Sequence, residues 1–442
     1  MTPSAPAGTR IVGTTAAEIS DSVRRLVDRG VLAPGDALPP VRALAEQLGI
    51  NRNTAVAAYR QLATSGVVVS AGRSGTRIVS PDPVAQEGFS RDDGARDVGA
   101  GNPDPRFIPD PSRALAQVTG RPVLYGSPVV DPDLETWARA FLSADLERDA
   151  DALRVTVTSG ASDALDRLFT ALLTPGDVVA IEDPGFLTGI HTLRVGGYRA
   201  APVPLDDEGM TPEGLRAALA AGARAVVHTP RAQNPTGVSL TAARARELRA
   251  ILADHPYVLL VEDDHFSLLS RRGFHSLIGP GHERWALVRS VSKFLGPDMS
   301  VALVASDAHT ADRLGMRLRP GTAWVSHLLQ RLALALVTDD AVRADIERAG
   351  SHYAARNDAF RTALARHGID CPPSDGLSIW VPVSAPARSV TARLRERGWV
   401  VRSGDEFRVS ASADPSHRVR VTAHDLDDAA QDALAAAIAA AA

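Results

Sequence analysis

Apolar positions recur with helical spacing through the first part of the chain. In AAEISDSVRRLVDRG, Ile19, Val23, Leu26 and Val27 fall on one face of a helix, and Gly30 ends it. A turn rich in proline and glycine, APGDALPP, follows. The next segment, VRALAEQLG, predicts a short helix that is again closed by a glycine. Each of these helices therefore offers one apolar face to a core.

A third helix and a hairpin complete this pattern. Asn51 is a good N-cap for RNTAVAAYRQLATSG, in which Val56, Tyr59 and Leu62 face inward. The segment VVVSAGRSGTRIVS then gives two β-rich runs around a glycine-rich turn. Helix, short helix, turn, helix and hairpin in this order predict a winged helix-turn-helix over residues 11–80.

The start of the third helix carries side chains suited to DNA. Such a helix enters the major groove with its N-terminus first, where arginine contacts guanine and asparagine contacts adenine. We therefore expect Asn51, Arg52, Asn53 and Thr54 to face a double-stranded operator. Residues 1–80 carry nine arginines against five acidic residues, although the whole chain has a net charge of −4. This basic head favours a polyanion, but a protein-interaction module remains an alternative.

The rest of the chain alternates strands with helices. Residues 81–98 mix proline, glycine and charge without apolar periodicity, which predicts a linker. Apolar runs beyond it end in polar residues, as the strands of a parallel α/β sheet do, and they place chemistry at the carboxyl ends of the strands. The runs are RVTVTSG, DVVAIEDPG, ARAVVHTP, YVLLVEDDH, WALVRSVS and VALVASD. Residues 99–442 form this second domain, with a smaller C-terminal part from about residue 340.

Composition excludes several classes of protein. The chain has one cysteine, Cys371, so it forms no internal disulfide, and it has no cysteine–histidine cluster for zinc. Its apolar stretches are too short to span a bilayer, and its start lacks the organisation of a signal peptide. We expect a cytoplasmic protein without a membrane partner and without a metal site.

Lys293 is the only lysine among 48 basic side chains. Arginine can replace lysine as a charge or a hydrogen-bond donor, but it does not lose its proton to attack a carbonyl. A lysine kept alone in this way indicates a Schiff base with an aldehyde, most often pyridoxal phosphate. The alternative is a surface cation spared by chance.

Four further places at strand ends suit such a cofactor. Ser159, Gly160 and Ala161 open a helix whose amides can bind phosphate. Phe186 can stack on a flat ring, and Asn234 can donate to a phenolic oxygen. Asp263 can protonate a pyridine nitrogen. Each position also has an ordinary structural interpretation, as a turn, a core aromatic or a helix cap.

The segment APGDALPPVRALAEQLGINRNTAVAAYRQLATSGVV resembles the DNA-binding domain of the GntR family of bacterial regulators. The similarity covers residues 11–80. It implies DNA contacts from Arg42 and from the wing as well as from the third helix; the wing residues are Arg73, Ser74, Gly75 and Thr76.

Residues 99–442 resemble fold-type I pyridoxal-phosphate enzymes of the aspartate aminotransferase superfamily. With a GntR-like head, the chain is similar to the MocR (GabR-like) subfamily of transcriptional regulators. The resemblance implies a head-to-tail homodimer that responds to a small-molecule effector. The site roles it implies are Lys293 for the Schiff base, Asp263 for the ring nitrogen, Asn234 for the ring hydroxyl, Phe186 for stacking, Ser159 to Ala161 with Ser292 for the phosphate, Tyr125 from the second subunit, and Arg420 for a ligand carboxylate.

Four positions depart from the family pattern, and two of them are Val130 in place of a glycine and Glu135 in place of an arginine. Ser300 stands where the family has a phosphate-binding arginine, and His265 stands where it has a tyrosine near the ring hydroxyl. Losing one charge-assisted bond costs about tenfold to a hundredfold in affinity, so the cofactor is expected to be weakly held. A regulator that senses pyridoxal phosphate or a related molecule fits this pattern. The alternatives are an active aminotransferase with a DNA-binding head, and a regulator whose large domain only dimerises.

Overall fold

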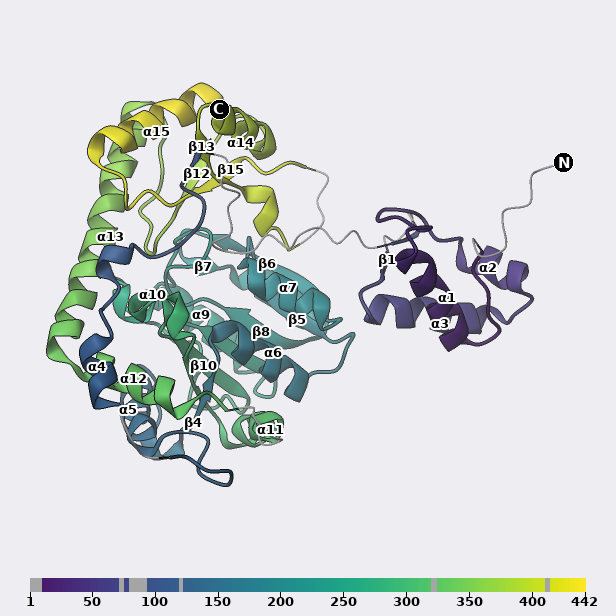
Figure 1. The fold of residues 1–442 in the computed structure, drawn as a ribbon, viewed down its shortest axis with the longest axis horizontal. Coiled ribbons are helices and arrows are strands. Elements are labelled where there is room, and N and C mark those ends of the chain that lie inside the picture. Colours follow the sequence, from purple (N-terminus) through teal and green to yellow (C-terminus); the bar gives the residue numbers. More distant parts are fainter. Residues whose placement is uncertain (1–9, 71–74, 79–93, 119–121, 319–323, 410–413) are drawn as a thin grey trace. The chain divides into compact units, whose positions relative to one another are not determined.

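The computed structural model of the chain describes residues 10–70, 75–78, 94–118, 122–318, 324–409 and 414–442. The chain divides into two compact units, an N-terminal one that extends to Ala85 and a larger one that holds most of the remaining residues (Figure 1). No helix in the described ranges is long and apolar enough to cross a membrane.

The N-terminal unit contains α1 (Ala16–Asp28), α2 (Val41–Leu48), α3 (Arg52–Thr64) and the antiparallel strands β1 (Val68–Ser70) and β2 (Thr76–Ile78). A capping box between Thr15 and Glu18 starts α1. Gly49 ends α2 with a φ of 66°, a left-handed conformation that favours glycine. The Oδ1 atom of Asn51 accepts a hydrogen bond from the amide of Asn53 at 2.8 Å and so starts α3. The predicted winged helix-turn-helix is confirmed.

The core of this unit comes from the apolar faces that the sequence predicts. Ile19, Val23 and Leu26 of α1 are buried against Leu44 of α2 and Leu62 of α3. Tyr59 is also buried, and its hydroxyl donates to the carbonyl oxygen of Pro39 at 2.6 Å. Val56 is only half-buried. The helical spacing therefore predicts which side of each helix faces inward.

The larger unit is built on an eight-stranded sheet in the order β4-β11-β10-β9-β8-β5-β6-β7. β10, β9, β8 and β5 pair in parallel, whereas β11 runs antiparallel to both of its neighbours. All residues of β9, β10 and β11 are buried, as expected for a sheet covered on both faces. The strands are β4 (Arg154–Thr158), β5 (Val178–Asp183), β6 (Arg199–Asp206), β7 (Gly209–Met210), β8 (Ala223–His228), β9 (Leu259–Asp263), β10 (Trp285–Ser290) and β11 (Ala302–Ser306).

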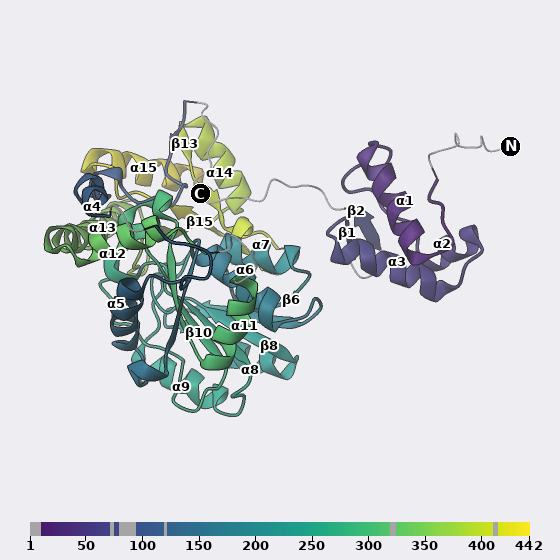
Figure 2. The same cartoon turned by 60° about the horizontal axis from the view of Figure 1, so that its bottom comes forward.

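Helices flank this sheet and follow its strands along the chain (Figures 1 and 2). The predicted mostly parallel α/β fold is confirmed, and all six predicted strands are present. β6 and β7 have no counterpart in the prediction. The helices are α4 (Ser112–Gln117), α5 (Pro132–Ser143), α6 (Ala161–Leu172), α7 (Leu187–Val195), α8 (Pro212–Ala220), α9 (Ala242–Leu252), α10 (Ser292–Leu295), α11 (Ala308–Leu318) and α12 (His327–Thr338).

The C-terminal part has a second core. The long helix α13 (Asp340–Arg366) contributes Ile346 and Tyr353 to the core of the large sheet, and Phe360 and Leu364 to the second core. It therefore links the two, and Figure 1 shows it along one side of the unit. The other elements are β12 (Ile379–Pro382), α14 (Ala387–Glu396), β13 (Trp399–Val400), β14 (Arg402–Ser403), β15 (Arg418–Val421) and α15 (Asp428–Ala441).

The N-terminal end of the larger unit joins this second core. β3 (Arg96–Asp97) pairs in parallel with β13, and β15 lies between β12 and β14 in an antiparallel sheet. Val98 is buried in the same core. The chain then passes along residues 99–104, which we call the strap, towards the carboxyl ends of the large sheet.

Candidate ligand site

A pocket at the carboxyl ends of the strands is lined by residues from six separate segments, one of which is residues 375–378. Gly101 comes from the strap, Asn234 follows β8, His265 follows β9, Lys293 follows β10 and Arg420 belongs to β15. Parallel strands bring their carboxyl ends to one edge of the sheet, which is why residues so far apart in sequence meet here.

Lys293 lies on α10, a single helical turn directly after β10. Its side chain is half-buried, and Nζ donates a hydrogen bond to the carbonyl oxygen of Gly101 at 2.9 Å. The amine is thus held in the pocket by the strap, and it lies among polar groups rather than on the open surface. A lysine spared by chance on the surface does not fit this position.

Asp263 ends β9 and is only 4% exposed. Burial, together with the nearby carboxylates of Asp264 and Glu182, raises the pKa of its carboxyl group to about 7. Among the described residues, its Oδ1 atom has no hydrogen-bond partner. A buried acceptor of this kind is costly unless a ligand group meets it.

Arg420 and Asn234 form one unit. Arg420 is fully buried, and its Nη1 atom donates to Oδ1 of Asn234 at 2.9 Å, while Nη2 donates to the carbonyl oxygen of Gly99 at 2.6 Å. Its guanidinium also lies 4.9 Å from the ring centroid of Phe407. Arg418, on the same strand, does not line the pocket. The pocket therefore singles out Arg420 among the two neighbouring arginines.

The rings of Phe186 and His265 lie almost parallel, with an interplanar angle of 9° and centroids 6.5 Å apart. Phe186 follows β5 and His265 follows β9, and His265 lines the pocket. Two parallel aromatic faces at this edge of the sheet suit contact with a flat heterocycle.

The predicted phosphate loop lies at the start of α6. Gly160 has a φ of 89° and precedes the helix, and Ser300 Oγ donates to the carbonyl oxygen of Ser159 at 3.3 Å. The amide of Ser159 donates to Oδ2 of Asp163 at 3.0 Å, and that of Gly160 donates to the carbonyl oxygen of Thr158 at 2.9 Å. Of the three predicted amides, these two thus already have partners within the protein.

Ser292 stands at the other side of the same region, in the first position of α10. Its amide donates to the Oγ atom of Ser290 at 3.2 Å, and the hydroxyl of Ser290 donates to that of Ser292 at 3.1 Å. The hydroxyl of Ser292 can still donate to an anion. The hydroxyl group of Ser300 is already donated to the carbonyl oxygen of Ser159. Sequence reasoning expected mainly backbone amides at this place, whereas the structure leaves the hydroxyl of Ser292 as a donor.

Sequence reasoning missed the residues that hold the strap. Nε2 of His424 bonds to the carbonyl oxygen of Asn102 at 3.0 Å, and the amide of Asp104 donates to the hydroxyl of Tyr353 at 3.1 Å. His424 is 3% exposed, and burial lowers its pKa. The strap is thus bonded to Lys293, Arg420, His424 and Tyr353 within six residues. No motif in the sequence marks these contacts.

Tyr125 is 79% exposed, and its ring lies edge-on to that of Trp324 with centroids 5.6 Å apart. This exposure leaves it available to a second subunit, which is where the sequence resemblance places it.

In the N-terminal unit, Arg52 and Asn53 are exposed at the start of α3, and Thr54 is half-buried. Asn51 uses its side-chain oxygen to cap the helix. The exposed Arg42 donates through Nε to Glu46 at 3.0 Å, so its terminal nitrogens stay available to phosphates. Gly75 and Thr76 lie at the wing, whereas Arg73 and Ser74 lie outside the described residues.

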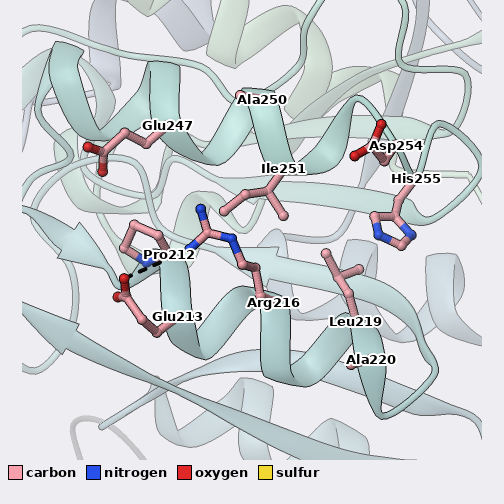
Figure 3. A pocket seen from close by; sticks show the side chains of 10 residues that line it. All are labelled: Pro212, Glu213, Arg216, Leu219, Ala220, Glu247, Ala250, Ile251, Asp254 and His255. Carbon is pink, nitrogen blue, oxygen red and sulfur yellow. Dashed lines mark ion pairs between the residues drawn. The ribbon is translucent and has the colours of Figure 1, made fainter.

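A larger hollow lies elsewhere, between α8 and α9 (Figure 3). Glu213 and Arg216 form an ion pair of 3.8 Å beside it, and Leu219 and Ile251 line it. It shares no residue with the pocket around Lys293, and it contains none of the residues that the sequence singles out.

Comparison with known proteins explains why these two units occur in one chain. Residues 15–78 match the family described as bacterial regulatory proteins, gntR family, and residues 100–438 match aminotransferase class I and II. The vitamin B6 salvage pathway transcriptional repressor PtsJ of Salmonella typhimurium is 46% identical over 97% of this chain and 98% of its own length. The chain belongs to the MocR-like GntR-family transcriptional regulators.

Other relatives of this MocR-like regulator agree. The probable rhizopine catabolism regulatory protein MocR of Rhizobium meliloti is 26% identical over 80% of this chain and 78% of that protein. Kynurenine aminotransferase of Pyrococcus horikoshii superposes with a TM-score of 0.72 at 20% identity, covering 79% of this chain and 91% of the enzyme. That likeness shows the fold of the larger unit.

A class I and II aminotransferase domain implies a pyridoxal-phosphate site, and the residues of this MocR-like regulator fit the group. The buried Oδ1 of Asp263 lacks a partner among the described residues, as an atom that awaits the ring nitrogen would. Lys293 provides an amine that lines the pocket, and its charge is close enough to Asp263 to act on the pKa of that carboxyl group.

Proposed function

We propose that this DNA-binding transcriptional regulator senses pyridoxal 5′-phosphate in the pocket around Lys293. The observation that carries the proposal is the pairing of a lone lysine with a buried acid, Asp263, whose Oδ1 atom has no partner in the described structure. The PtsJ repressor of the vitamin B6 salvage pathway, 46% identical to this chain, supports the same ligand class.

Each pocket residue has a distinct role in this proposal. When bound, pyridoxal phosphate supplies an aldehyde that Lys293 can attack and a ring that withdraws electrons. Asp263 holds a proton at the ring nitrogen, and its raised pKa lets it carry that proton near neutral pH. Asn234 donates to the ring hydroxyl together with His265. Phe186 contacts the face of the ring, and Arg420 binds a carboxylate on a second ligand.

The phosphate is proposed to be held weakly. Ser300 occupies the position where the family has an arginine, and the hydroxyl of a serine gives one neutral hydrogen bond where arginine gives a charged pair. The amide of Ser159 is already bonded to Asp163, whose own charge is balanced by Arg167 at 2.7 Å. Weak retention suits a sensor, because the occupied fraction then follows the concentration of the free ligand.

The proposed function also assigns roles to the domains and to a second subunit. We propose a head-to-tail homodimer in which the exposed Tyr125 reaches the pocket of the second subunit. The head, residues 11–80, binds operator DNA. The tether begins at residue 81 and ends before β3, earlier than the predicted bound of 98, because β3 and Val98 already belong to the larger unit. That unit, to residue 442, binds the ligand, with a small C-terminal subdomain from about residue 340. Arg42, Arg52, Asn53, Thr54 and the wing would contact DNA.

Absorption spectra and DNA binding together test the proposal. The purified full-length protein is expected to gain visible absorbance on addition of pyridoxal phosphate, and its affinity for operator DNA is expected to change with the same midpoint. Lys293→Ala should remove the absorbance and any adduct that borohydride fixes. A wild-type protein that shows no spectral change with excess ligand contradicts the proposal.

Aminotransferase activity is the second candidate, because Arg420 and Asn234 are arranged as a carboxylate-binding pair. An amino acid bound there would lie beside Lys293, which could move a proton to and from its Cα atom. Amino-acid-dependent formation of a keto acid by the purified protein would establish this activity. Ligand-dependent DNA binding without keto-acid formation would favour the sensor alone.

A further inference from the structure

Asp264, the residue directly after Asp263, is a fully buried carboxylate at the centre of an ion-pair network. Arg231 donates to it through two atoms, Nε to Oδ1 and Nη2 to Oδ2, both at 2.8 Å. Arg289 donates through Nε to Oδ2 at 2.7 Å. The amide of Ser267 donates to Oδ1 at 3.2 Å. Two guanidinium groups thus neutralise one buried carboxylate, which keeps the pKa of Asp264 below its usual value despite burial.

The partners of Asp264 lie on the segments that carry the ligand-binding groups. Arg231 is three residues before Asn234 in the loop after β8. Asp264 itself follows Asp263. Arg289 is on β10, four residues before Lys293. One carboxylate therefore ties together the three chain segments that supply Asn234, Asp263 and Lys293.

Aromatic rings and a helix fix the two arginines from the outside. The guanidinium of Arg289 lies 4.9 Å from the ring centroids of both Phe141 and Phe274, and that of Arg231 lies 5.2 Å from Phe274. Arg289 also donates to Asp145 and to the carbonyl oxygen of Phe141 on α5. Both arginines are therefore held by contacts other than those with Asp264, and Arg289 is only 1% exposed.

We propose that Asp264 and Arg231 are positioning residues, which set the spacing between Asn234, Asp263 and Lys293 that a pyridoxal ring requires. This inference rests on the proposed function, because it concerns the same ligand. Neither residue lines the pocket, so both act through their neighbours. A bidentate arginine–carboxylate pair fixes direction as well as distance, and a lysine cannot reproduce it.

Arg231→Gln is the informative change, because Asp264 keeps Arg289 as a buried counter-ion. The dissociation constant for pyridoxal phosphate should rise roughly tenfold to a hundredfold, the range that loss of a ligand-orienting group causes at metal sites. The absorption maximum of the bound ligand should shift as well, since the ring would no longer meet Asp263 and Asn234 together. Arg231→Lys should restore only part of the affinity.

Arg244→Gln is the matched control. Arg244 also makes a bidentate contact, through Nη1 and Nη2 to Asp206 at 2.9 and 2.8 Å, and its side chain is 9% exposed against 12% for Arg231. Its partners lie on β6 and after it, away from the pocket. Arg244→Gln is therefore expected to lower the melting temperature but to leave the affinity and the spectrum of the ligand unchanged.

Asp264→Asn gives an independent measurement. If it folds, it should also weaken binding of pyridoxal phosphate. The double variant with Arg231→Gln should bind no worse than the weaker single variant, because both changes break the contact between Asp264 and Arg231. If it does not fold, the positioning role is tested by comparing Arg231→Gln with Arg231→Lys and Arg244→Gln.

The outcomes separate the two proposals. A wild-type protein that binds pyridoxal phosphate, with an Arg231→Gln variant that loses stability but keeps both affinity and absorption maximum, overturns the positioning role and leaves the sensor intact. A wild-type protein that does not bind the ligand overturns both.

Discussion

The Nζ atom of Lys293 donates a hydrogen bond to the carbonyl oxygen of Gly101, 2.9 Å away. The nitrogen cannot keep this geometry once it is bonded to an aldehyde carbon, because its direction and its number of protons change. The strap should therefore lose one of its four anchors when the ligand reacts. Hydrogen exchange of residues 99–104 should be faster with pyridoxal phosphate than with pyridoxine phosphate, which has no aldehyde. Equal exchange with the two ligands would show that the strap does not depend on Nζ.

Substitutions at Ser300 and His265 are expected to differ in their effect on the preference for the phosphorylated aldehyde. Ser300→Arg should tighten binding of pyridoxal phosphate by at most about a hundredfold and should affect pyridoxal little, because only the former has a phosphate to contact. His265→Tyr acts at the ring hydroxyl and should improve both aldehydes similarly. Titration of the wild type and both variants with the two aldehydes measures this. An unchanged phosphate preference in Ser300→Arg would mean that the ligand places no phosphate there.

Asp263 should make folding stability depend on pH. Its pKa is about 7 in the folded chain against 3.8 for an exposed aspartate, so between these values only the folded state holds the proton. Stability without ligand therefore falls as pH rises through this window, by roughly 2–4 kcal/mol at most. Asp263→Asn should raise the melting temperature at pH 8 and change it little at pH 3.5.

Glu182→Gln is the control for this prediction. Burial also raises the pKa of Glu182 to about 7, so removing its charge should stabilise the chain at pH 8 in the same way. Only Asp263→Asn should also weaken pyridoxal phosphate binding. If Asp263→Asn melts at the wild-type temperature at pH 8, its carboxylate is not destabilised by burial.

Arg52 should contribute to base recognition. It is exposed at the start of α3, and Arg52→Ala should cost roughly 1–3 kcal/mol for a duplex selected by the wild type from a random library, with relaxed discrimination at one base. Arg24→Ala on α1 removes the same charge from a different helix and should not change discrimination. Fluorescence anisotropy at fixed salt measures both. If Arg52→Ala discriminates between base pairs as well as the wild type does, Arg52 does not read a base and the placement of α3 in the major groove is contradicted.

The sequence predicts the parts of the site that depend on local patterns. Lys293 and Asp263 follow apolar runs, and such runs become neighbouring strands whose ends meet. The helix caps at Asn51 and Gly49 are visible for the same reason, since capping depends on adjacent residues.

The contacts between distant segments could not be predicted. Nothing near Arg231 in the sequence indicates that it meets Asp264, because that contact depends on the order of β8, β9 and β10 in the sheet. The engaged amides of Ser159 and Gly160 were missed for a different reason. Their partners are nearby, but a hydrogen bond within a turn depends on backbone angles that the residue types leave open.

A single lysine also makes the occupancy of the site directly countable. A protease specific for lysine can cut the denatured chain at one peptide bond, between Lys293 and Phe294. Any group fixed on Nζ by reduction abolishes that cut. The ratio of intact chain to the two fragments on a gel of the purified protein would therefore report, without a label, the fraction of subunits that carried the ligand.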